Sequence, residues 1–512
     1  MLAMVNTLAL TGIEAKPVMV EIDIQNGLPA FEIVGLASTA IKEARERVRA
    51  AIKNSGFKFP NRKIIVNLAP ADFKKEGSHF DLAIAVGILI ASGQLENNLP
   101  ASYFLAGELS LNGAVRAVPG ILPMALELEA AAGEPRLVIP EENCAEAALV
   151  REVSSYQVSH LHDICRFISE AQPLKPVIYT ADGEINLPPI DAPDFAEVKG
   201  QENAKRALQI AAAGLHNVLL IGPPGGGKTM LARRMPGILP EMTREEVLQT
   251  TRIYSVANLL NGNTPLITQR PFRTPHKNAS TASIVGGGRI PKPGEISLAQ
   301  NGVLFLDELP EFSRDVLEAL RQPLEDKIVT IARTQATYTY PADFSLISSC
   351  NPCPCGNFGS ELECSCTPLQ IHKYLGRISG PLLDRMDLHV EVPRIQYEQL
   401  QDQSRTENSA SIRARVKQAR EMQSRRFAGT KITLNSQMTP AMVKAYCKLD
   451  MKSEQMLKQA FNRFNMSARA YDRILKVART IADLEGSADI KAQHVAEAIQ
   501  YRSLDRKYWR NL

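Results

Sequence analysis

One eight-residue segment constrains the fold of this chain more than any other, because it is rich in glycine and directly follows the apolar run Val218–Ile221. Its residues are Gly222, Pro223, Pro224, Gly225, Gly226, Gly227, Lys228 and Thr229. A buried strand, a glycine-rich loop and a Lys-Thr pair in this order predict a P-loop that leads into a helix. The loop turns backbone N–H groups toward phosphates, Lys228 adds a positive charge, and Thr229 can ligate Mg²⁺. We therefore expect a P-loop α/β domain that binds ATP and Mg²⁺.

A second apolar strand, residues 302–306, ends in two carboxylates, Asp307 and Glu308. Strands without polar residues are typical of parallel sheets buried on both faces, and ligands bind such sheets at the carboxyl ends of the strands. We interpret Asp307 as the partner of Mg²⁺ through water and Glu308 as the base that orients the attacking water. The alternative is an acidic helix N-terminus, in which Asp307 only complements the helix dipole.

A third strand is predicted at residues 344–349 and is followed by Asn351. An amide at the end of a strand between the two phosphate-site strands can hydrogen-bond the γ-phosphate or the attacking water. The alternative is that Asn351 only starts a turn before Pro352. Before this strand we expect a helix at 315–324 and a β-hairpin at 327–340.

The composition excludes a membrane protein. The 512 residues contain no stretch of eighteen uncharged apolar residues, and two to four globular domains are expected. The first residues, Met1–Thr7, lack a basic segment followed by an apolar one, so we expect a cytoplasmic protein. The net charge of +4 is too small to indicate a polyanion partner, but residues 42–63 and the helix predicted at 411–426 are basic. Each basic segment has the alternative of a solvated helix face.

The chain divides into four predicted segments. Residues 1–172 alternate short strands with helices and predict an α/β or α+β domain. Residues 173–194 contain five prolines and predict a semi-rigid linker. Residues 195–395 form the P-loop core, with insertions around 270–276 and 286–288, and residues 396–512 show the apolar spacing of a small helical domain.

Longer blocks of sequence resemble the magnesium-chelatase-like AAA+ family. They are residues 270–276 (RPFRTPH), 293–299 (PGEISLA), 301–312 (NGVLFLDELPEF), 351–356 (NPCPCG) and 379–387 (SGPLLDRMD). Within that family the chain is similar to the YifB/ComM proteins from end to end. The resemblance implies a ring-forming, hexameric ATPase, and ComM members act as DNA helicases that drive branch migration during natural transformation.

The resemblance also implies roles for three side chains. Asn351 corresponds to sensor 1. Arg385, in the motif Leu-Leu-Asp-Arg, resembles the arginine finger that reaches the γ-phosphate of the neighbouring subunit, and a planar guanidinium suits that task. Its alternative is an ion pair with Asp384 or Asp387. Arg469 resembles sensor 2 on the helical lid, where it would touch the phosphates of its own subunit, and its alternative is a solvated helix arginine.

Five of the eight cysteines lie between residues 350 and 366, which argues for a metal site and against a disulfide framework. Cys353 and Cys355 are followed, after eight residues, by Cys364 and Cys366. Four thiolates in two pairs predict a closed tetrahedral Zn²⁺ site, although C-x-C is tighter than the usual spacing. The alternative is a reduced, metal-free loop. We expect Cys350 to be a core residue.

The N-terminal domain is similar to the Lon-protease-like (ribosomal protein S5 domain 2-like) fold, particularly at residues 74–81 and 107–116. Peptidase activity would need a Ser-Lys dyad. Here His79 falls at the position of the nucleophile and no lysine occupies the position of the base, so we expect no peptidase. An adjacent Ser78-His79 pair is more often a turn than a dyad.

We expect DNA contacts on the hairpin at 327–340, where Lys327 and Arg333 can meet phosphates beside Tyr338 and Tyr340. The alternative is an ordinary exposed hairpin decorated with basic residues. The sequence as a whole favours an ATP-driven translocase acting on single-stranded, forked or branched DNA. A magnesium-chelatase-type motor that remodels a protein partner is the alternative, and a scaffold with a structural nucleotide is disfavoured because binding alone needs neither Glu308 nor Arg385.

Overall fold

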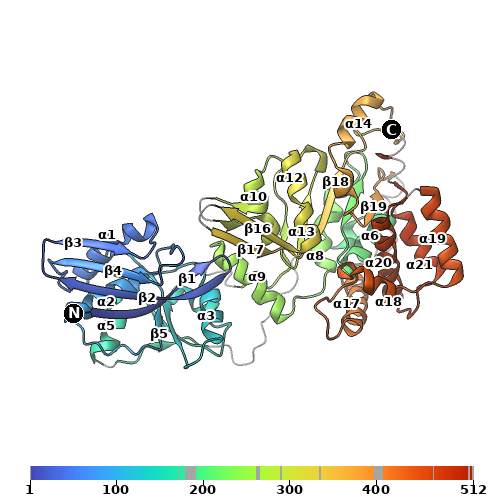
Figure 1. Ribbon diagram of the computed structural model, residues 1–512. Coiled ribbons are helices and arrows are strands. Elements are labelled where there is room, and N and C mark those ends of the chain that lie inside the picture. The colour runs from blue at the N-terminus through green and yellow to red at the C-terminus, as the bar shows by residue number, and fades with distance from the viewer. Residues whose placement is uncertain are drawn as a thin grey trace.

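The computed structural model describes residues 2–170, 172–178, 192–260, 266–288, 291–333, 336–396, 407–464, 466–504 and 508–509. Figure 1 shows an N-terminal α/β body at the left, a central α/β body, and a group of helices at the right. The mixed α/β fold predicted from the sequence is confirmed, whereas the predicted segment boundaries stay predictions. Most of the predicted linker lies outside the described residues. Within the described ranges, no helix combines the length and apolar character that a membrane span needs.

The N-terminal body is built on one mixed sheet of eight strands, in the order β10-β9-β8-β5-β1-β2-β4-β3. Its elements are β1 Leu2–Thr11, β2 Glu14–Gln25, β3 Ala30–Val34, α1 Thr39–Asn54, β4 Lys63–Ala69, α2 Asp81–Ala91, β5 Tyr103–Leu105, β6 Glu108–Leu109, β7 Val115–Arg116, α3 Ile121–Glu129, β8 Arg136–Pro140, α4 Cys144–Ala147, β9 Ser154–Val158, α5 Leu161–Glu170 and β10 Lys175–Pro176. Every residue of α2 is buried, because this apolar helix packs against β1 and β2 and is covered by α1 and α5. The sheet and α2 thus form the core of this body.

The central body is built on a parallel sheet of five strands, in the order β12-β15-β18-β11-β19. Its elements are α6 Glu202–Gly214, β11 Val218–Ile221, α7 Lys228–Arg233, α8 Met235–Ile238, α9 Arg244–Val256, β12 Phe272–Arg273, β15 Val303–Leu306, α12 Arg314–Ala319, α13 Arg321–Asp326, β18 Ser345–Cys350, α14 Pro368–Leu375, α15 Gly380–Leu383 and β19 Leu388–Glu391. All residues of β11, β15 and β18 are buried. Since the strands are parallel, the loops that follow these three strands meet at one edge of the sheet.

Two hairpins extend from this body. Their elements and the short helices beside them are α10 Thr281–Val285, β13 Gly286–Gly287, β14 Lys292–Pro293, α11 Glu295–Leu298, β16 Ile328–Arg333 and β17 Ala336–Pro341. The hairpins contact each other, since the Tyr340 hydroxyl donates to the Pro291 carbonyl oxygen over 2.8 Å. Figure 1 shows β16 and β17 on the side of the central body that faces the N-terminal body.

The C-terminal helices are α17 Ser409–Arg426, α18 Pro440–Tyr446, α19 Met451–Phe464, α20 Ala468–Leu484 and α21 Ala492–Gln500. Helix α20 is central, because it contacts α17, α21 and also α6 of the central body. Its apolar face joins the core cluster that includes β11 and α6. The helical group is therefore part of the same core as the parallel sheet.

Helix α9 connects the central body to the N-terminal body. It packs against α3, and the Ser255 hydroxyl at its end donates to Glu146 of α4. Ser255 also accepts from the backbone N–H of Gly120, over 3.0 Å. Burial raises the pKa of the Glu146 carboxyl, which accepts a second bond from the backbone N–H of Leu122.

Candidate active site

The P-loop lies between β11 and α7, as the sequence predicts, and two of its glycines have clear structural reasons. A Cβ at Gly222 would overlap the carbonyl oxygen of Val392, so only glycine allows this close approach to the end of β19. Gly227 has a φ of +88°, a left-handed conformation that side chains disfavour. Lys228 begins α7 behind this turn. These residues shape a loop whose backbone N–H groups can surround phosphates.

The Lys228 ammonium is held at the mouth of this loop by three oxygen atoms. It donates to the carbonyl oxygens of Gly222 and Pro223, over 2.7 and 3.0 Å, and to Asn351 Oδ1 over 3.1 Å. Burial lowers the pKa of Lys228, and the nearby Asp307 and Glu308 oppose that shift. The predicted sensor amide of Asn351 therefore lies beside the P-loop lysine, because the strands β11 and β18 that precede them are neighbours in the sheet.

The two predicted Mg²⁺ partners also meet. The Thr229 hydroxyl donates to Asp307 Oδ2 over 2.8 Å, which joins the start of α7 to the end of β15. A hydroxyl and a carboxylate are the hard oxygen ligands that Mg²⁺ prefers. The residues present therefore fit a magnesium ion accompanying a nucleotide.

Ser349 is a member of the site that the sequence reasoning missed. Its hydroxyl donates to Asp307 Oδ1 and accepts from the backbone N–H of Glu308 over 3.1 Å. The same N–H also points at Asp307 Oδ1, over 3.1 Å. Glu308 has a φ of +53°, which is uncommon for a residue with a side chain and costs of order 1 kcal/mol or more. Ser349, fully buried on β18, therefore fixes the carboxylate pair from the neighbouring strand.

The Glu308 carboxylate forms an ion pair with Lys277, whose Nζ lies 2.7 Å from Glu308 Oε2. Lys277 follows β12, the strand next to β15, so the pair again joins the ends of adjacent strands. Both side chains are over two-fifths exposed, and such a pair contributes little to stability. The basic residue was not singled out from the sequence, although its place after the 270–276 block could have drawn attention to it.

Arg385 and Arg469 lie together, in a cavity of about 630 Å³ whose lining also includes Lys327, Lys431 and Lys476. The Arg385 guanidinium is nearly buried, donates to the Pro381 carbonyl oxygen over 2.8 Å, and pairs with Glu325. Its ion pair is therefore with Glu325, and not with Asp384 or Asp387, the two acids considered from the sequence.

The Asp387 carboxylate instead pairs with the Arg473 guanidinium and with the ring of His216. Burial alone would raise the pKa of Asp387, but these two partners hold it far below its usual range. Arg473 also donates to the carbonyl oxygen of Arg385 over 2.9 Å. The exposed Arg469 is thus grouped with Arg385, and the P-loop residues are not among the lining of their cavity.

The four predicted zinc ligands converge. The Sγ atoms of Cys353, Cys355, Cys364 and Cys366 all lie within 4.8 Å of one another. The separations from Cys355 Sγ to Cys353 Sγ and Cys364 Sγ are 3.3 and 3.6 Å. A tetrahedron with Zn–S bonds of about 2.3 Å has edges of about 3.8 Å, so the cluster fits zinc. Cys350 is fully buried, and burial raises the pKa of its thiol to about 12, as suits the expected core residue.

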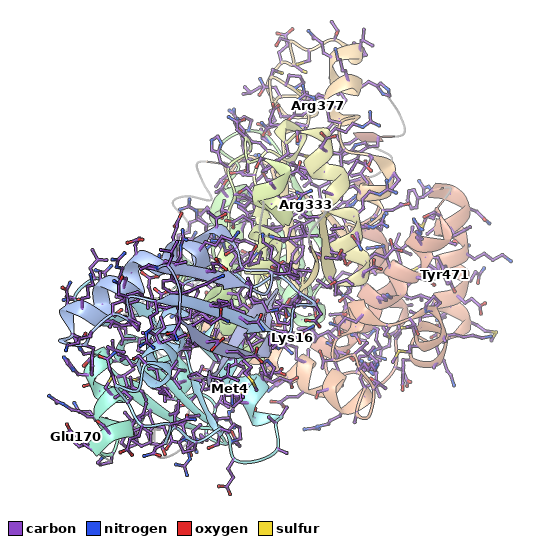
Figure 2. All side chains as sticks on the ribbon, turned by 60° about the vertical axis from the view of Figure 1, so that its left-hand side comes forward. Met4, Lys16, Glu170, Arg333, Arg377 and Tyr471 are labelled. Atoms are coloured by element: carbon purple, nitrogen blue, oxygen red, sulfur yellow. The ribbon has the colours of Figure 1, made fainter. Side chains whose placement is uncertain are left out.

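The predicted hairpin is observed at β16 and β17, but its basic and aromatic residues occupy different environments. Arg333 is exposed near the end of β16, labelled in Figure 2, with its guanidinium close to Gly287 of the other hairpin. Lys327 lies at the hairpin's base, where it pairs with Asp343 at 3.3 Å. Tyr340 is fully buried, so its ring is not exposed beside Arg333. Tyr338 lines a cavity of about 800 Å³ shared with residues 11–16 of the N-terminal body.

The N-terminal body carries no Ser-His dyad at residues 78 and 79. The Ser78 hydroxyl donates to Glu108. A ring nitrogen of the buried His79 lies 2.8 Å from the Leu8 carbonyl oxygen, and burial lowers the His79 pKa to about 4. Each side chain therefore has a structural partner of its own.

Three arginines of the basic segments noted in the sequence make internal contacts. On α17, Arg420 donates to the Ala212 carbonyl oxygen and Arg426 pairs with the buried Asp483. On α1, Arg47 pairs with the buried Asp81. These three arginines contribute to packing between elements, whereas other basic residues of the two segments, such as Lys42, Lys417 and Arg425, are exposed.

Models of magnesium-chelatase families match most of the chain. The description "Magnesium chelatase, subunit ChlI" covers residues 194–400, "Subunit ChlI of Mg-chelatase" covers 20–143, and "Magnesium chelatase, subunit ChlI C-terminal" covers 406–502. The "Uncharacterized protein YifB" of Salmonella typhimurium is 46% identical over 508 residues, which are 99% of this chain and 98% of that protein. The "Competence protein ComM" of Haemophilus influenzae is 46% identical over 510 residues, with the same coverage. The "Magnesium-chelatase 67 kDa subunit" of Chlorobaculum parvum is 28% identical over 162 residues, 31% of this chain and 23% of that protein.

Proposed function

The chain belongs to the magnesium-chelatase-like family that includes the YifB and ComM proteins, and we propose that it is an ATP-driven DNA translocase. In this proposal it works as a cytoplasmic, hexameric ring and drives branch migration in recombination or natural transformation. The observation that carries the ATPase function is the meeting of Lys228, Thr229, Asp307, Glu308 and Asn351 at one edge of the parallel sheet. The Haemophilus influenzae relative is named a competence protein, which supports the link to DNA.

Hydrolysis divides its tasks among these side chains. The P-loop N–H groups and Lys228 would bind the phosphates. Thr229 and Asp307 would hold Mg²⁺, which supplies positive charge against the phosphate oxygens. Glu308 takes the proton from the attacking water, and Asn351 orients that water or the γ-phosphate. Ser349, on the neighbouring strand, positions both acidic residues through its hydrogen bonds to the Asp307 carboxylate and the Glu308 N–H.

From the sequence, Arg385 is expected to act on the nucleotide of a neighbouring subunit and Arg469 on that of its own subunit; we instead propose that both arginines serve the neighbour's nucleotide. Their common cavity, lined by further lysines, supports that assignment because it groups them apart from the P-loop of their own chain. A guanidinium from a neighbour stabilises the charge of the transferring phosphoryl group and couples hydrolysis to assembly. Arg385 is paired with Glu325 in this structure, so this ion pair would have to break before Arg385 could contact the phosphates.

DNA binding is assigned to the two packed hairpins, with Arg333 as the phosphate contact. Arg333 is exposed, and its guanidinium lies beside Gly287 of the other hairpin. Lys327 is a weaker candidate, because Asp343 already neutralises its charge. A Lon-like N-terminal domain and a helical lid complete the proposed architecture, and the contacts of α9 with α3 would transmit movement of the ring to the N-terminal domain.

We further propose that the four-cysteine cluster holds one structural Zn²⁺. All four positions would be filled by thiolates, which leaves none for water and no catalytic role for the metal.

A magnesium-chelatase-type motor that remodels a protein partner is the second candidate, favoured by the similarity to the Chlorobaculum subunit. The two candidates differ in what activates hydrolysis. Purified protein should hydrolyse ATP faster when single-stranded or forked DNA is added, and the stimulation should fall with rising salt because phosphate contacts release counterions. ATP hydrolysis that no DNA accelerates at low salt would favour the motor for a protein partner.

A further inference from the structure

The segment that carries the first two cysteines also touches the P-loop at three points. The Cys350 carbonyl oxygen accepts from the backbone N–H of Gly222 over 3.2 Å. Asn351 Oδ1 accepts from Lys228 over 3.1 Å. Gly356 lies so close to the ring of Pro224 that a Cβ at residue 356 would overlap Cδ of the proline. One side of the nucleotide loop is thus built from residues 350–356.

The cysteine cluster determines where this segment lies. Gly356 directly follows Cys355, and its N–H donates to the Cys353 carbonyl oxygen over 3.0 Å. Two further bonds close the loop on itself, from the Phe358 N–H to Cys353 Sγ and from the Cys355 N–H to Cys366 Sγ, over 3.3 and 3.4 Å. Segment 353–366 contains no regular helix or strand, so its shape depends on the cluster.

We propose that the metal-bound cysteine cluster positions the P-loop, so that nucleotide affinity depends on the bound metal. The inference rests on the proposed ATPase and zinc site, and it makes Gly356 the positioning residue between them. Without the metal, the loop loses the four bonds that restrict it, and the wall against Pro224 is no longer fixed. Because the groups of a binding site must be held within about 0.5 Å of their productive geometry, a larger shift of this loop should weaken nucleotide binding measurably.

The first test compares two Gly→Ala variants of the full chain. Gly356 and Gly429 have nearly the same left-handed φ, +83° and +79°, so both substitutions strain the backbone equally. Only Gly356 faces a neighbour, since a Cβ at Gly429 would meet no described atom within 4 Å. The loop in Gly356→Ala must shift by about 1 Å to restore ordinary carbon contacts.

We expect Gly356→Ala to retain its zinc but to weaken binding of a fluorescent ATP analogue ~10- to 100-fold, and Gly429→Ala to bind like the parent protein. The double variant Gly356→Ala/Pro224→Ala should bind more tightly than Gly356→Ala alone, because the colliding Cδ is absent. Equal affinities in Gly356→Ala and Gly429→Ala would refute the positioning role. Failure of Pro224→Ala to recover any affinity would refute it as well.

The second test removes the metal. Cys364→Ser/Cys366→Ser should lose zinc, measured by elemental analysis, and lose nucleotide affinity to at least the extent of Gly356→Ala. A folded, zinc-free variant that binds the ATP analogue normally would overturn the inference. Parent protein that binds the analogue but contains no metal would overturn the inference and leave the proposed ATPase standing, whereas parent protein that binds no analogue would overturn both.

Discussion

Replacing Ser349 by alanine tests whether the strand next to β15 positions the catalytic carboxylates. The substitution removes the hydroxyl that donates to Asp307 Oδ1 and accepts from the Glu308 N–H. A hydrogen bond to a charged group contributes about 1.5–3 kcal/mol, and every 1.4 kcal/mol is about tenfold. Second-shell groups at metal sites typically affect affinity or activity by a similar ~10- to 100-fold. We therefore expect Ser349→Ala to lower ATP turnover about 10- to 100-fold and to raise the Mg²⁺ concentration needed for half-maximal rate.

The assay is steady-state ATP hydrolysis at several Mg²⁺ concentrations, together with binding of a fluorescent nucleotide in the absence of Mg²⁺. Binding without Mg²⁺ should change little, because the P-loop contacts of Lys228 do not involve Ser349.

Ser348→Ala is the matched control for this prediction. Ser348 is the preceding residue of the same strand and is equally buried, and its Oγ has no hydrogen-bond partner among the described residues. Its removal should leave turnover unchanged. If Ser348→Ala and Ser349→Ala have the same turnover and the same Mg²⁺ dependence, the positioning role of Ser349 is wrong.

Four further predictions follow from the site and the fold. Glu308→Gln should keep ATP affinity but lose turnover by ~100-fold or more, because a general base acts only in the transition state; an equal loss of binding would contradict that role. Arg385→Ala should bind ATP yet be nearly inactive, and mixing it with Lys228→Ala should restore some hydrolysis at interfaces that pair an intact finger with an intact P-loop; mixed rings without recovery would exclude action between subunits. Arg333→Ala should weaken DNA binding across sequences and lower the slope of log affinity against log salt by about one, with basal hydrolysis unchanged, whereas normal DNA-stimulated turnover would move the DNA site elsewhere. Because burial lowers the pKa of His79 to about 4, the folded protein resists protonation there, so the free energy of unfolding should fall by up to ~3 kcal/mol as the pH drops from about 6.5 to about 4, and His79→Gln should lose that dependence in pH-dependent denaturation.

The parts of the site that follow strands were predictable from the sequence. The runs before Gly222 and Asp307 are short and wholly apolar, and the run before Asn351 is a short strand that is buried although it contains three serines. Parallel packing brings the ends of such strands to one edge. The hairpin predicted at 327–340 is also observed, at 328–333 and 336–341. The local sequence pattern is sufficient to predict these elements because the residues of each motif themselves favour its backbone conformation.

A side chain's environment could not be predicted from the sequence where it depends on elements that are distant along the chain. The burial of Tyr340 was not predicted, and its hydroxyl donates to the Pro291 carbonyl oxygen beside the other hairpin. Ser349 carries no local signal, since its partners Asp307 and Glu308 precede it by some forty residues. The helix expected at 315–324 is divided into α12 and α13, with Pro323 near the start of the second helix. Such features are set by tertiary packing, which outweighs local propensity.

If ATP hydrolysis by this chain moves DNA, the protein should move the branch point of a synthetic Holliday junction. Purified parent protein is incubated with a labelled junction that has mobile arms, with ATP, without ATP, and as the Glu308→Gln variant with ATP. Only the parent protein with ATP should convert the junction to its branch-migration products. Intact ATP hydrolysis without any conversion of junctions or forked DNA, or equal conversion by Glu308→Gln, would contradict the proposal that hydrolysis moves DNA.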